Sequence, residues 1–495
     1  MKLSLLVCEM TDPISVPDLE ISRVTERADC ADSASLFVCI KGAVADGHHF
    51  ASVAYENGCR VFVAERALSL PDDALILRVK STREAIARLA CRFYGHPSHT
   101  MRLIGVTGTK GKTTTARLLS HILNKSGIPC GYIGTNGVFY ADQRLDCKNT
   151  TPDAITLQST LAEMQKRGVE AAVIEVSSQA LMQMRADGTR FEGVIFTNLT
   201  PDHIGPREHD SFDHYKSCKA RLFTDFGAKW AIFNADDTHT ADFSAVTTAE
   251  HRIFCSQIDC RADFYADGVS LMRAETTLGI SFDLCVGDEQ AFVSLPLMGR
   301  VNASNALLAL ATANRMFEIP LSNAIDALTD SAVEGRSELI SLPCGASAVI
   351  DYAHTGESLS QLLLTLREYE PSRLIVLFGS IGERAQMRRA ELGAVAAELA
   401  DLAILTSDNP NFENPTAIIR EIAEAFTDSH TPYLAIPDRA DAIREAVALL
   451  QKDDLLVLAG KGHETYQLIN GEKVAFSERE ILLDAARKRA LLTRA

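Results

Sequence analysis

Short apolar runs alternate with helical patterns along most of the chain. Runs without polar positions are typical of strands that are buried on both faces of a parallel sheet. Between residues 262 and 298, shorter polar–apolar alternations predict antiparallel strands beside the middle sheet. The pattern as a whole predicts an α/β fold. The strands predicted from the apolar runs are 36–40, 61–64, 103–106, 171–176, 194–197, 374–378, 402–406 and 455–459.

The same pattern divides the chain into three predicted domains. A length of 495 residues suits about three domains. The segment Tyr94-Gly95-His96-Pro97-Ser98 has the composition of a loop, so we place the first boundary there. The predicted domains are 1–98, 99–332 and 333–495, and the strong strand–helix alternation of the third predicts a Rossmann-like unit.

Composition narrows the class of protein. A net charge of −16 argues against nucleic acid or an anionic membrane as the main partner. No apolar run approaches the roughly 18 residues of a membrane span, and the N-terminus lacks the layout of a signal peptide. The 12 cysteines are scattered singly, which indicates free thiols in a reducing compartment. We therefore expect a cytoplasmic monomer with no nucleic-acid or membrane partner.

A glycine-rich loop between strand 103–106 and a helical pattern at 116–123 carries the first chemistry. Backbone N–H groups of such a loop, together with the N-terminus of the helix, bind phosphate, and a following Lys-Thr pair serves the phosphates and Mg²⁺. Val106 stands where the general phosphate-loop pattern has its first glycine. We predict an ATP site made by Gly108, Thr109, Lys110, Gly111, Lys112, Thr113 and Thr114.

A carboxylate follows a neighbouring predicted strand. Glu175 lies at the end of 171–176, and ligands of open α/β sheets bind at the carboxyl ends of the strands. A carboxylate at that edge is suited to hold Mg²⁺ beside the phosphates. Taken alone, a solvated loop glutamate is an equal alternative.

Several further motifs, in order along the chain, identify a family. The chain resembles the UDP-N-acetylmuramoyl-tripeptide synthetases, which are Mur ligases, and its compact glycine loop is also typical of folylpolyglutamate synthetases. The resemblance implies a three-domain Mur ligase architecture, with a central parallel sheet like that of P-loop ATPases and a C-terminal Rossmann-like domain. It implies ATP- and Mg²⁺-dependent addition of an amino acid to UDP-N-acetylmuramoyl-L-alanyl-D-glutamate through an acyl phosphate, a step of peptidoglycan precursor synthesis. The motifs are Lys41-Gly42 with Asp46-Gly47-His48, Asn149-Thr150-Thr151-Pro152, Glu175-Val176-Ser177-Ser178, Thr197 to His203, Arg300 to Ala306, Gly335-Arg336-Ser337-Glu338, Asp351-Tyr352-Ala353-His354 and Gly460-Lys461-Gly462-His463-Glu464.

The resemblance also implies roles for individual residues. Lys112, Glu175, His203 and a carbamylated Lys219 would be catalytic, and Thr113, Glu175, His203 and Lys219 would hold metal ions. Lys216 is the rival position for the modified lysine. Further ATP contacts would be Asn302, Arg336 and Asp351. The UDP-dipeptide would contact Lys41, His48, Thr150, Thr151, Ser177, Gln183 and Arg185. The incoming amino acid would contact Arg389, Asp408, Asn409, Asn411, Gly460 and Glu464.

Three departures from the family pattern bear on the site. Ala28 stands where relatives have a serine that contacts the UDP-sugar. Gln179 replaces a histidine, so that position keeps a hydrogen-bonding group but does not titrate near neutral pH. An insertion at 205–208 lengthens the loop between His203 and Lys219.

The amino acid to be added is predicted from Asp408-Asn409-Pro410-Asn411. Enzymes that add meso-diaminopimelate usually have arginine at the last position, and asparagine lacks that cationic fork. Asp408 and Glu464 offer negative charge that suits an ammonium group, so L-lysine is favoured over meso-diaminopimelate. Arg389 is the candidate for the common α-carboxylate. Alternatively, Asn411 is only a turn residue after proline.

Two other functions stay open at this point. One is a different Mur-type ligase or a folylpolyglutamate synthetase. The other is a nucleotide-binding scaffold derived from a ligase, which predicts loss of Lys112, Glu175, His203 or Lys219. All four are present.

Overall fold

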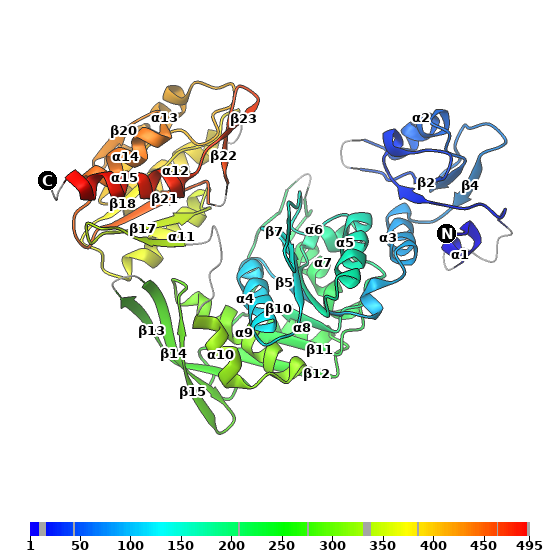
Figure 1. The fold of residues 1–495 in the computed structure, drawn as a ribbon, viewed down its shortest axis with the longest axis horizontal. Coiled ribbons are helices and arrows are strands. Elements are labelled where there is room, and N and C mark those ends of the chain that lie inside the picture. The colour runs from blue at the N-terminus through cyan, green and yellow to red at the C-terminus, as the bar shows by residue number, and fades with distance from the viewer. Residues whose placement is uncertain are drawn as a thin grey trace. The chain divides into compact units, whose positions relative to one another are not determined.

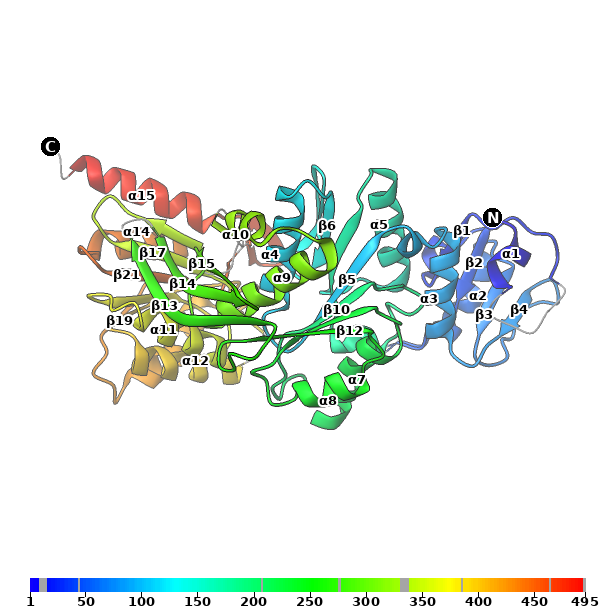
Figure 2. The ribbon, with the colours of Figure 1, turned by 90° about the horizontal axis from the view of Figure 1, so that it is seen from below.

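The structure is a computed structural model that describes residues 1–8, 16–42, 45–205, 208–274, 277–329, 338–383, 386–462 and 464–492. Figures 1 and 2 follow these residues from blue at the N-terminus to red at the C-terminus. The chain divides into two compact units. The first is Met1–Asp267 with Leu284–Gln290 and Ser304–Ala327, and the second is Gly268–Asp283 with Ala291–Ala303 and Leu328–Ala495.

The N-terminal part of the first unit holds a four-stranded parallel sheet in the order β1-β2-β3-β4. Alternate residues of β2 and β3 point to opposite faces, and both faces are covered: Leu36 and Val61 join one apolar cluster, Phe37 and Phe62 another. The strands are Arg23–Thr25, Ser35–Val38, Val61–Ala64 and Leu75–Arg78, and the helices are α1 (Leu3–Val7), η1 (Ala28–Cys30), η2 (Gly47–Phe50), α2 (Ala51–Glu56) and α3 (Thr82–Phe93).

The central sheet runs in the order β15-β14-β13-β12-β11-β10-β5-β9-β6-β7-β8. The strand that precedes the glycine loop, β5, lies between β9 and β10 and pairs with both in parallel. The carboxyl ends of these three strands therefore meet at one edge, where the predicted catalytic residues begin. The strands are β5 (Arg102–Thr107), β6 (Cys130–Gly134), β7 (Gly137–Tyr140), β8 (Gln143–Leu145), β9 (Ala171–Glu175), β10 (Gly193–Phe196), β11 (Trp230–Asn234), β12 (His251–Ser256), β13 (Phe264–Ala274), β14 (Thr277–Val286) and β15 (Glu289–Leu295).

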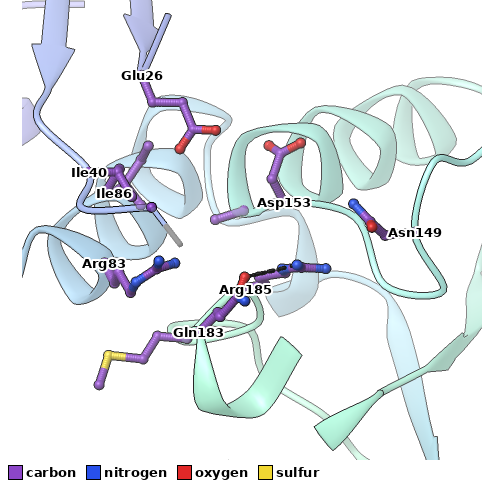
Figure 3. A pocket seen from close by; sticks show the side chains of 11 residues that line it. Glu26, Ile40, Arg83, Ile86, Asn149, Asp153, Gln183 and Arg185 are labelled. Atoms are coloured by element: carbon purple, nitrogen blue, oxygen red, sulfur yellow. Dashed lines mark hydrogen bonds between the residues drawn. The ribbon is translucent and has the colours of Figure 1, made fainter. Parts of the chain in front are cut away.

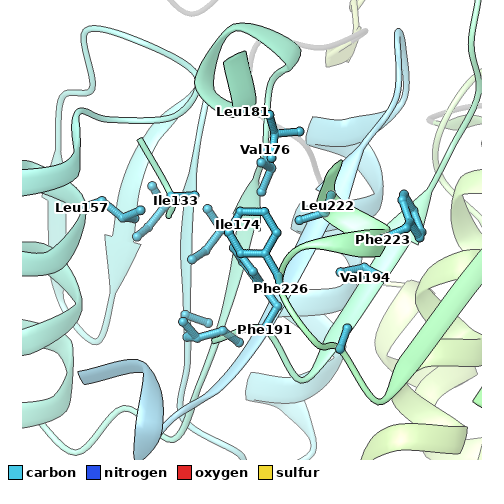
Figure 4. Close-up of a cluster of buried hydrophobic side chains, with 14 of the residues drawn as sticks. Ile133, Leu157, Ile174, Val176, Leu181, Phe191, Val194, Leu222, Phe223 and Phe226 are labelled. Atoms are coloured by element: carbon cyan, nitrogen blue, oxygen red, sulfur yellow. The ribbon is translucent and has the colours of Figure 1, made fainter. Parts of the chain in front are cut away.

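Helices cover the central sheet and hold its strand ends in place. Apolar side chains of α5, α6 and α7, including Leu157, Leu181 and Leu222, pack with Ile174 and Val194 of the sheet (Figure 4). The helix after the glycine loop, α4, packs against β6 and β9. The helices are η3 (Pro97–His99), α4 (Lys112–Lys125), α5 (Ala154–Lys166), α6 (Ser178–Met182), α7 (Phe212–Thr224), α8 (Thr240–Val246), α9 (Val301–Phe317) and α10 (Leu321–Thr329).

The C-terminal part has a six-stranded sheet in the order β16-β17-β21-β18-β19-β20, parallel except for β16. Leu374, Val376 and Phe378 face α11, α12 and α13, whereas Ile375 and Leu377 face α14 and α15. This two-sided burial is typical of a Rossmann-like unit. The elements are β16 (Glu338–Ser341), β17 (Ser347–Asp351), α11 (Gly356–Arg367), β18 (Leu374–Phe378), α12 (Gln386–Leu399), β19 (Leu402–Leu405), α13 (Pro415–Ala423), η4 (Glu424–Phe426), β20 (Tyr433–Ala435), α14 (Arg439–Leu449), β21 (Leu455–Ala459), a hairpin of β22 (Tyr466–Ile469) and β23 (Glu472–Ala475), and α15 (Glu478–Leu492).

The predicted α/β class and parallel sheets are confirmed. Strands 61–64, 374–378 and 455–459 have the predicted bounds, and the other runs differ by one or two residues at their ends. All twelve cysteines are free thiols. Among the described residues, every helix is too short or too polar to cross a lipid bilayer.

Candidate active site

The glycine loop between β5 and α4 has the geometry of a phosphate cradle. Gly108 and Gly111 have φ angles of 150° and 82°, and Gly111 is the N-cap of α4. Asn198, at the end of β10, holds the loop from the side: its Oδ1 accepts from the Lys110 backbone N–H at 2.9 Å, and its carbonyl accepts from the Thr109 N–H at 2.9 Å. The helix N-terminus and its N–H groups are thereby fixed next to the loop.

Gly108 leaves no space for a side chain. A Cβ atom there would lie 1.9 Å from Thr197 Oγ1 and 2.9 Å from the Asn198 carbonyl oxygen. We expect Gly108→Ala to raise the KM for ATP and to lower the free energy of unfolding by about 1–3 kcal/mol, because the loop must shift. Urea unfolding and ATP titration of the rate measure both effects.

Gly127→Ala is the matched control for that substitution. Gly127 also has a positive φ, 83°, but none of the described residues comes within 4 Å of the Cβ atom that alanine would add. It should therefore show the cost of backbone strain without any change in the KM for ATP. An unchanged KM in Gly108→Ala would contradict the crowding argument.

Two lysine ammonium groups converge on one carbonyl of the loop. Lys112 Nζ and Lys219 Nζ each donate to the Gly108 carbonyl at 2.8 Å. Lys219 is 2% exposed, and its Nζ lies 4.5 Å from the centre of the Tyr215 ring. Burial, reinforced by the charge of Lys112, holds the pKa of Lys219 well below its usual range. Carbamylation requires a neutral amine, and a sheltered site that lowers the pKa of a lysine favours that form.

The rival lysine has different surroundings. Lys216, three residues earlier on α7, forms an ion pair with Asp242 at 3.0 Å, and both side chains are partly exposed. Of the two lysines, Lys219 has its amine at the glycine loop.

Glu175 is fully buried at the end of β9 and accepts from four donors. Thr113 Oγ1 donates at 3.0 Å, Thr135 donates through its backbone N–H at 3.1 Å and its hydroxyl at 3.2 Å, and the Tyr132 hydroxyl makes a close contact. Burial and the neighbouring Glu175 raise the pKa of Tyr132. Two of the four predicted metal ligands, Glu175 and Thr113, are therefore adjacent. Their oxygen donors fit Mg²⁺.

Tyr132 and Thr135 were not predicted from the sequence. Thr135 directly follows β6, so the rule that sites form at the carboxyl ends of parallel strands would have included it. Tyr132 lies inside an apolar run and gave no such signal.

His203 lies half-exposed in the loop that follows β10. Its Nδ1 is 3.0 Å from Glu208 Oε1, and the same oxygen is 3.5 Å from Gln179 Nε2. Two departures from the family pattern, Gln179 and the insertion, thus meet at the predicted metal ligand. The His203 and Tyr215 rings are 6.3 Å apart, and the Tyr215 hydroxyl is 3.0 Å from Thr109 Oγ1, so Tyr215 links this loop to the phosphate cradle.

A cavity of about 310 Å³ lies within the first unit (Figure 3). Its charged lining is Glu26, Arg83, Asp153 and Arg185. Burial lowers the pKa of Arg185. Burial also raises the pKa of Glu26, and the nearby carboxylate of Asp153 adds to that increase. The cavity is lined by Glu26, Ile40, Gly42, Arg83, Ile86, Asn149, Asp153, Ala154, Gln183, Met184 and Arg185. Three charged lining residues, Glu26, Arg83 and Asp153, were not predicted, and Ala28 is not part of the lining.

Five of the predicted UDP-dipeptide residues are close to this cavity or to Glu175. Arg185 donates to Gln183 Oε1 at 2.8 Å and to the Thr151 carbonyl at 2.8 Å. The Thr151 hydroxyl donates to the Glu175 carbonyl at 2.7 Å and accepts from the Ser177 N–H at 3.0 Å. Thr150 Oγ1 lies 3.1 Å from Thr135 Oγ1. A continuous chain of contacts therefore connects the cavity to the predicted metal ligand.

The two remaining residues of that group are placed differently. His48 is buried, its Nδ1 lies 2.6 Å from Asp46 Oδ1, and its Nε2 accepts from the Glu65 N–H at 3.1 Å. Both ring nitrogens thus serve the fold and leave no nitrogen for a substrate. Lys41 is exposed, and its carbonyl accepts from Arg83, which lines the cavity.

Most of the predicted amino-acid residues surround Lys461 in the second unit. The buried Lys461 Nζ lies 2.9 Å from Glu464 Oε2, 3.1 Å from Asn409 Oδ1 and 3.3 Å from Asp408 Oδ1. Lys461 therefore neutralises one of the two negative charges that the lysine prediction assigned to a substrate ammonium. Gly460 lies next to this group, with its N–H donating to the Asp351 carbonyl at 3.1 Å.

Asn411 and Arg389 are engaged by the fold. Asn411 has a φ of 52°, its Oδ1 accepts from the Gly471 N–H at 2.8 Å, and its Nδ2 contacts Glu383. These contacts are what the turn-residue alternative predicts. Arg389 is 1% exposed and is held by Glu413 at 2.7 Å and by a second carboxylate, Glu421, at 2.9 Å, so its charge is neutralised within the protein.

The remaining predicted ATP contacts belong to the second unit. Asn302 is in the first turn of α9, and its Nδ2 donates to the Met298 carbonyl at 2.7 Å. Asp351 ends β17, and its carboxylate accepts from the Ala353 N–H at 2.8 Å. Arg336, and His463 of the Gly-Lys-Gly-His-Glu motif, lie outside the described residues.

Comparison with known proteins addresses the family directly. Three family models match the chain in order. The model described as "Mur ligase family, catalytic domain" matches residues 31–94, and the "Mur ligase middle domain" matches residues 106–313. The model described as "Mur ligase, glutamate ligase domain" matches residues 335–462. The UDP-N-acetylmuramoyl-L-alanyl-D-glutamate–2,6-diaminopimelate ligase of Bacillus licheniformis is 38% identical over 483 residues, 96% of this chain and 95% of its own. The Chlorobaculum tepidum protein of the same name is 39% identical over 474 residues, 93% and 92% of the two chains.

Solved structures of Mur ligases resemble this chain in fold. One of a protein with that name has a TM-score of 0.74 at 28% identity and covers 99% of this chain and 100% of its own. MurF ligase from Thermotoga maritima in complex with ADP, at 18% identity and a TM-score of 0.60 over 97% of this chain and 100% of its own, shares the fold. The resemblance predicted from the motifs is confirmed. The chain belongs to the Mur ligase family, has its three-domain α/β fold, and is an ATP-dependent, ADP-forming peptide ligase.

Proposed function

We propose that this ligase adds a diamino acid, meso-diaminopimelate, to UDP-N-acetylmuramoyl-L-alanyl-D-glutamate in peptidoglycan precursor synthesis. The observation that carries the proposal is identity of 38–39% over almost the whole chain to ligases named for 2,6-diaminopimelate. A cytoplasmic monomer with domains 1–98, 99–332 and 333–495 remains our expectation.

The first chemical step activates a carboxylate, which by itself repels nucleophiles and lacks a leaving group. An oxygen of the dipeptide's terminal carboxylate attacks the γ-phosphorus of ATP, ADP leaves, and an acyl phosphate results. Lys112 would neutralise the phosphates, and the glycine loop would position them. Thr113, Glu175, His203 and a carbamylated Lys219 would hold Mg²⁺, which would supply further charge neutralisation at the phosphate oxygens.

The second step forms the peptide bond. The amine of the incoming amino acid attacks the acyl carbon, loses a proton, and expels inorganic phosphate. Charge stabilisation and orientation account for most of the rate in such a reaction.

Carbamylation of Lys219 suits the electrostatics of the loop. A positive charge on Lys219 would be repelled by Lys112, because both Nζ atoms contact the Gly108 carbonyl. A carbamate on Lys219 would replace that repulsion by attraction to Lys112 and would offer carboxylate-like oxygens to a hard metal ion.

The proposal replaces the preference for L-lysine. That preference depended on free negative charge at Asp408 and Glu464, but Lys461 pairs with both carboxylates and neutralises one of the two charges. It also depended on Asn411 as a selective residue, whereas its side chain is bound within a turn. With both supports weakened, the names of the relatives favour meso-diaminopimelate.

A competition experiment tests the amino acid. Equal concentrations of meso-diaminopimelate and L-lysine are supplied with ATP and the UDP-dipeptide, and the products are separated by mass. We expect the diaminopimelate product to exceed the lysine product by at least about tenfold, equivalent to about 1.4 kcal/mol. A majority of lysine product would overturn the assignment.

Asn411→Gly is the informative variant in the same assay. Glycine tolerates the left-handed backbone of this position, so the turn should persist. If Asn411 is a turn residue, the product ratio stays unchanged; a changed ratio would return Asn411 to the substrate site.

A further inference from the structure

A buried histidine near the active-site loop has an unused nitrogen. His209 lies in the loop that joins β10 to α7 and is fully buried. Its Nε2 lies 2.9 Å from Ser178 Oγ. Its Nδ1 is buried and, among the described residues, has no hydrogen-bond partner. A buried polar atom of this kind is costly unless a ligand, ion or water satisfies it.

Two further donors stand beside it on α7. His214 and Cys218 are four residues apart and therefore share one face of the helix. One donor atom each from His209, His214 and Cys218 lie within 4.8 Å of one another. The His209 and His214 rings meet edge to face at 5.1 Å, and Cys218 is 5% exposed.

We propose that His209, His214 and Cys218 bind one Zn²⁺ ion. None of these three residues is among the predicted Mg²⁺ ligands. Two imidazoles and a thiolate are ligands for a borderline-soft metal, whereas Mg²⁺ takes oxygen ligands. On binding, the Cys218 thiol gives its proton to solvent and its sulfur bonds to the metal, and water fills the fourth position.

The site would join two segments that carry predicted catalytic residues. The His209 N–H donates to the His203 carbonyl at 3.0 Å, so a metal on His209 restrains the loop of His203. Cys218 directly precedes Lys219 on α7. The ion would therefore act as a structural clamp between the loop and the helix.

Metal titration of the full-length protein tests the site. The protein is freed of metal with a chelator, placed in excess Mg²⁺ to saturate oxygen-ligand sites, and titrated with Zn²⁺ against a colorimetric chelator and with Co²⁺ by absorption. We expect one equivalent of Zn²⁺, and a thiolate-to-Co²⁺ charge-transfer band.

Variants separate this site from other metal binding. Cys218→Ser should abolish the band, and His214→Gln, at a half-exposed position that tolerates change, should weaken Zn²⁺ binding by more than the about 10–100-fold cost of losing an outer-shell partner. Cys260→Ser, at an exposed thiol, should change neither. Absence of the charge-transfer band in the wild-type protein, or equal Zn²⁺ affinity in wild type and His214→Gln, would overturn the proposal.

Discussion

Lys219→Ala is expected to reduce ligation by about 10²–10³-fold or more, the scale of removing one preorganised charge-stabilising group. The buried amine lies against the Gly108 carbonyl, and no other lysine of α7 is in that position among the described residues. Bicarbonate should restore part of the activity, because a small anion with carboxylate-like oxygens can enter the space that the side chain leaves. ADP release with and without added bicarbonate measures both effects.

Lys216→Ala is the control on the same helix. Its ion pair with Asp242 is partly exposed, and surface substitutions usually change stability by less than about 0.5 kcal/mol. ADP release should stay within about twofold of the wild type and should not respond to bicarbonate. Full activity of Lys219→Ala would end the assignment of Lys219 as the modified residue.

Glu175→Gln is expected to lower kcat/KM by about 10²–10³-fold and to raise the Mg²⁺ concentration needed for half-maximal rate. The substitution keeps the shape of the side chain but removes the negative charge that faces Thr113. The hydroxyls of Thr113 and Thr135 can rotate to accept from the new amide, so the protein should remain folded. Initial rates across a Mg²⁺ titration, with circular dichroism as a check of folding, measure this.

Glu170→Gln provides the comparison. Glu170 is exposed just before β9, so this substitution removes the same charge from the surface. Its Mg²⁺ dependence should match that of the wild type. If Glu175→Gln also showed an unchanged Mg²⁺ dependence, Glu175 would not be a metal ligand.

Strand positions followed from the sequence because burial on both faces demands uninterrupted apolar runs. Residues 374–378 and 455–459 have no polar position, and each run follows a charged residue and precedes a glycine, so even their ends were predicted. The position of Glu175 beside Thr113 followed in the same way, from the rule that parallel strands end at one edge.

Side-chain contacts between distant segments could not be predicted from the sequence. Lys461 lies more than fifty residues after Asp408, and only folding brings its ammonium between the carboxylates that we had assigned to a substrate. Arg389 is neutralised by Glu413, and both nitrogens of His48 are engaged, for the same reason. A sequence pattern places charged residues at a strand end, but their neutralisation depends on long-range packing.

Oxygen transfer tests the central claim, that ATP activates the dipeptide carboxylate as an acyl phosphate. The UDP-dipeptide is labelled with ¹⁸O in both carboxylates of its terminal glutamate and incubated with ATP, Mg²⁺ and meso-diaminopimelate. Because the attacking carboxylate oxygen becomes the bridging oxygen and leaves with phosphorus, we predict one ¹⁸O atom in the released inorganic phosphate per peptide bond formed. Unlabelled phosphate, or ADP release that does not require the UDP-dipeptide, would contradict the account.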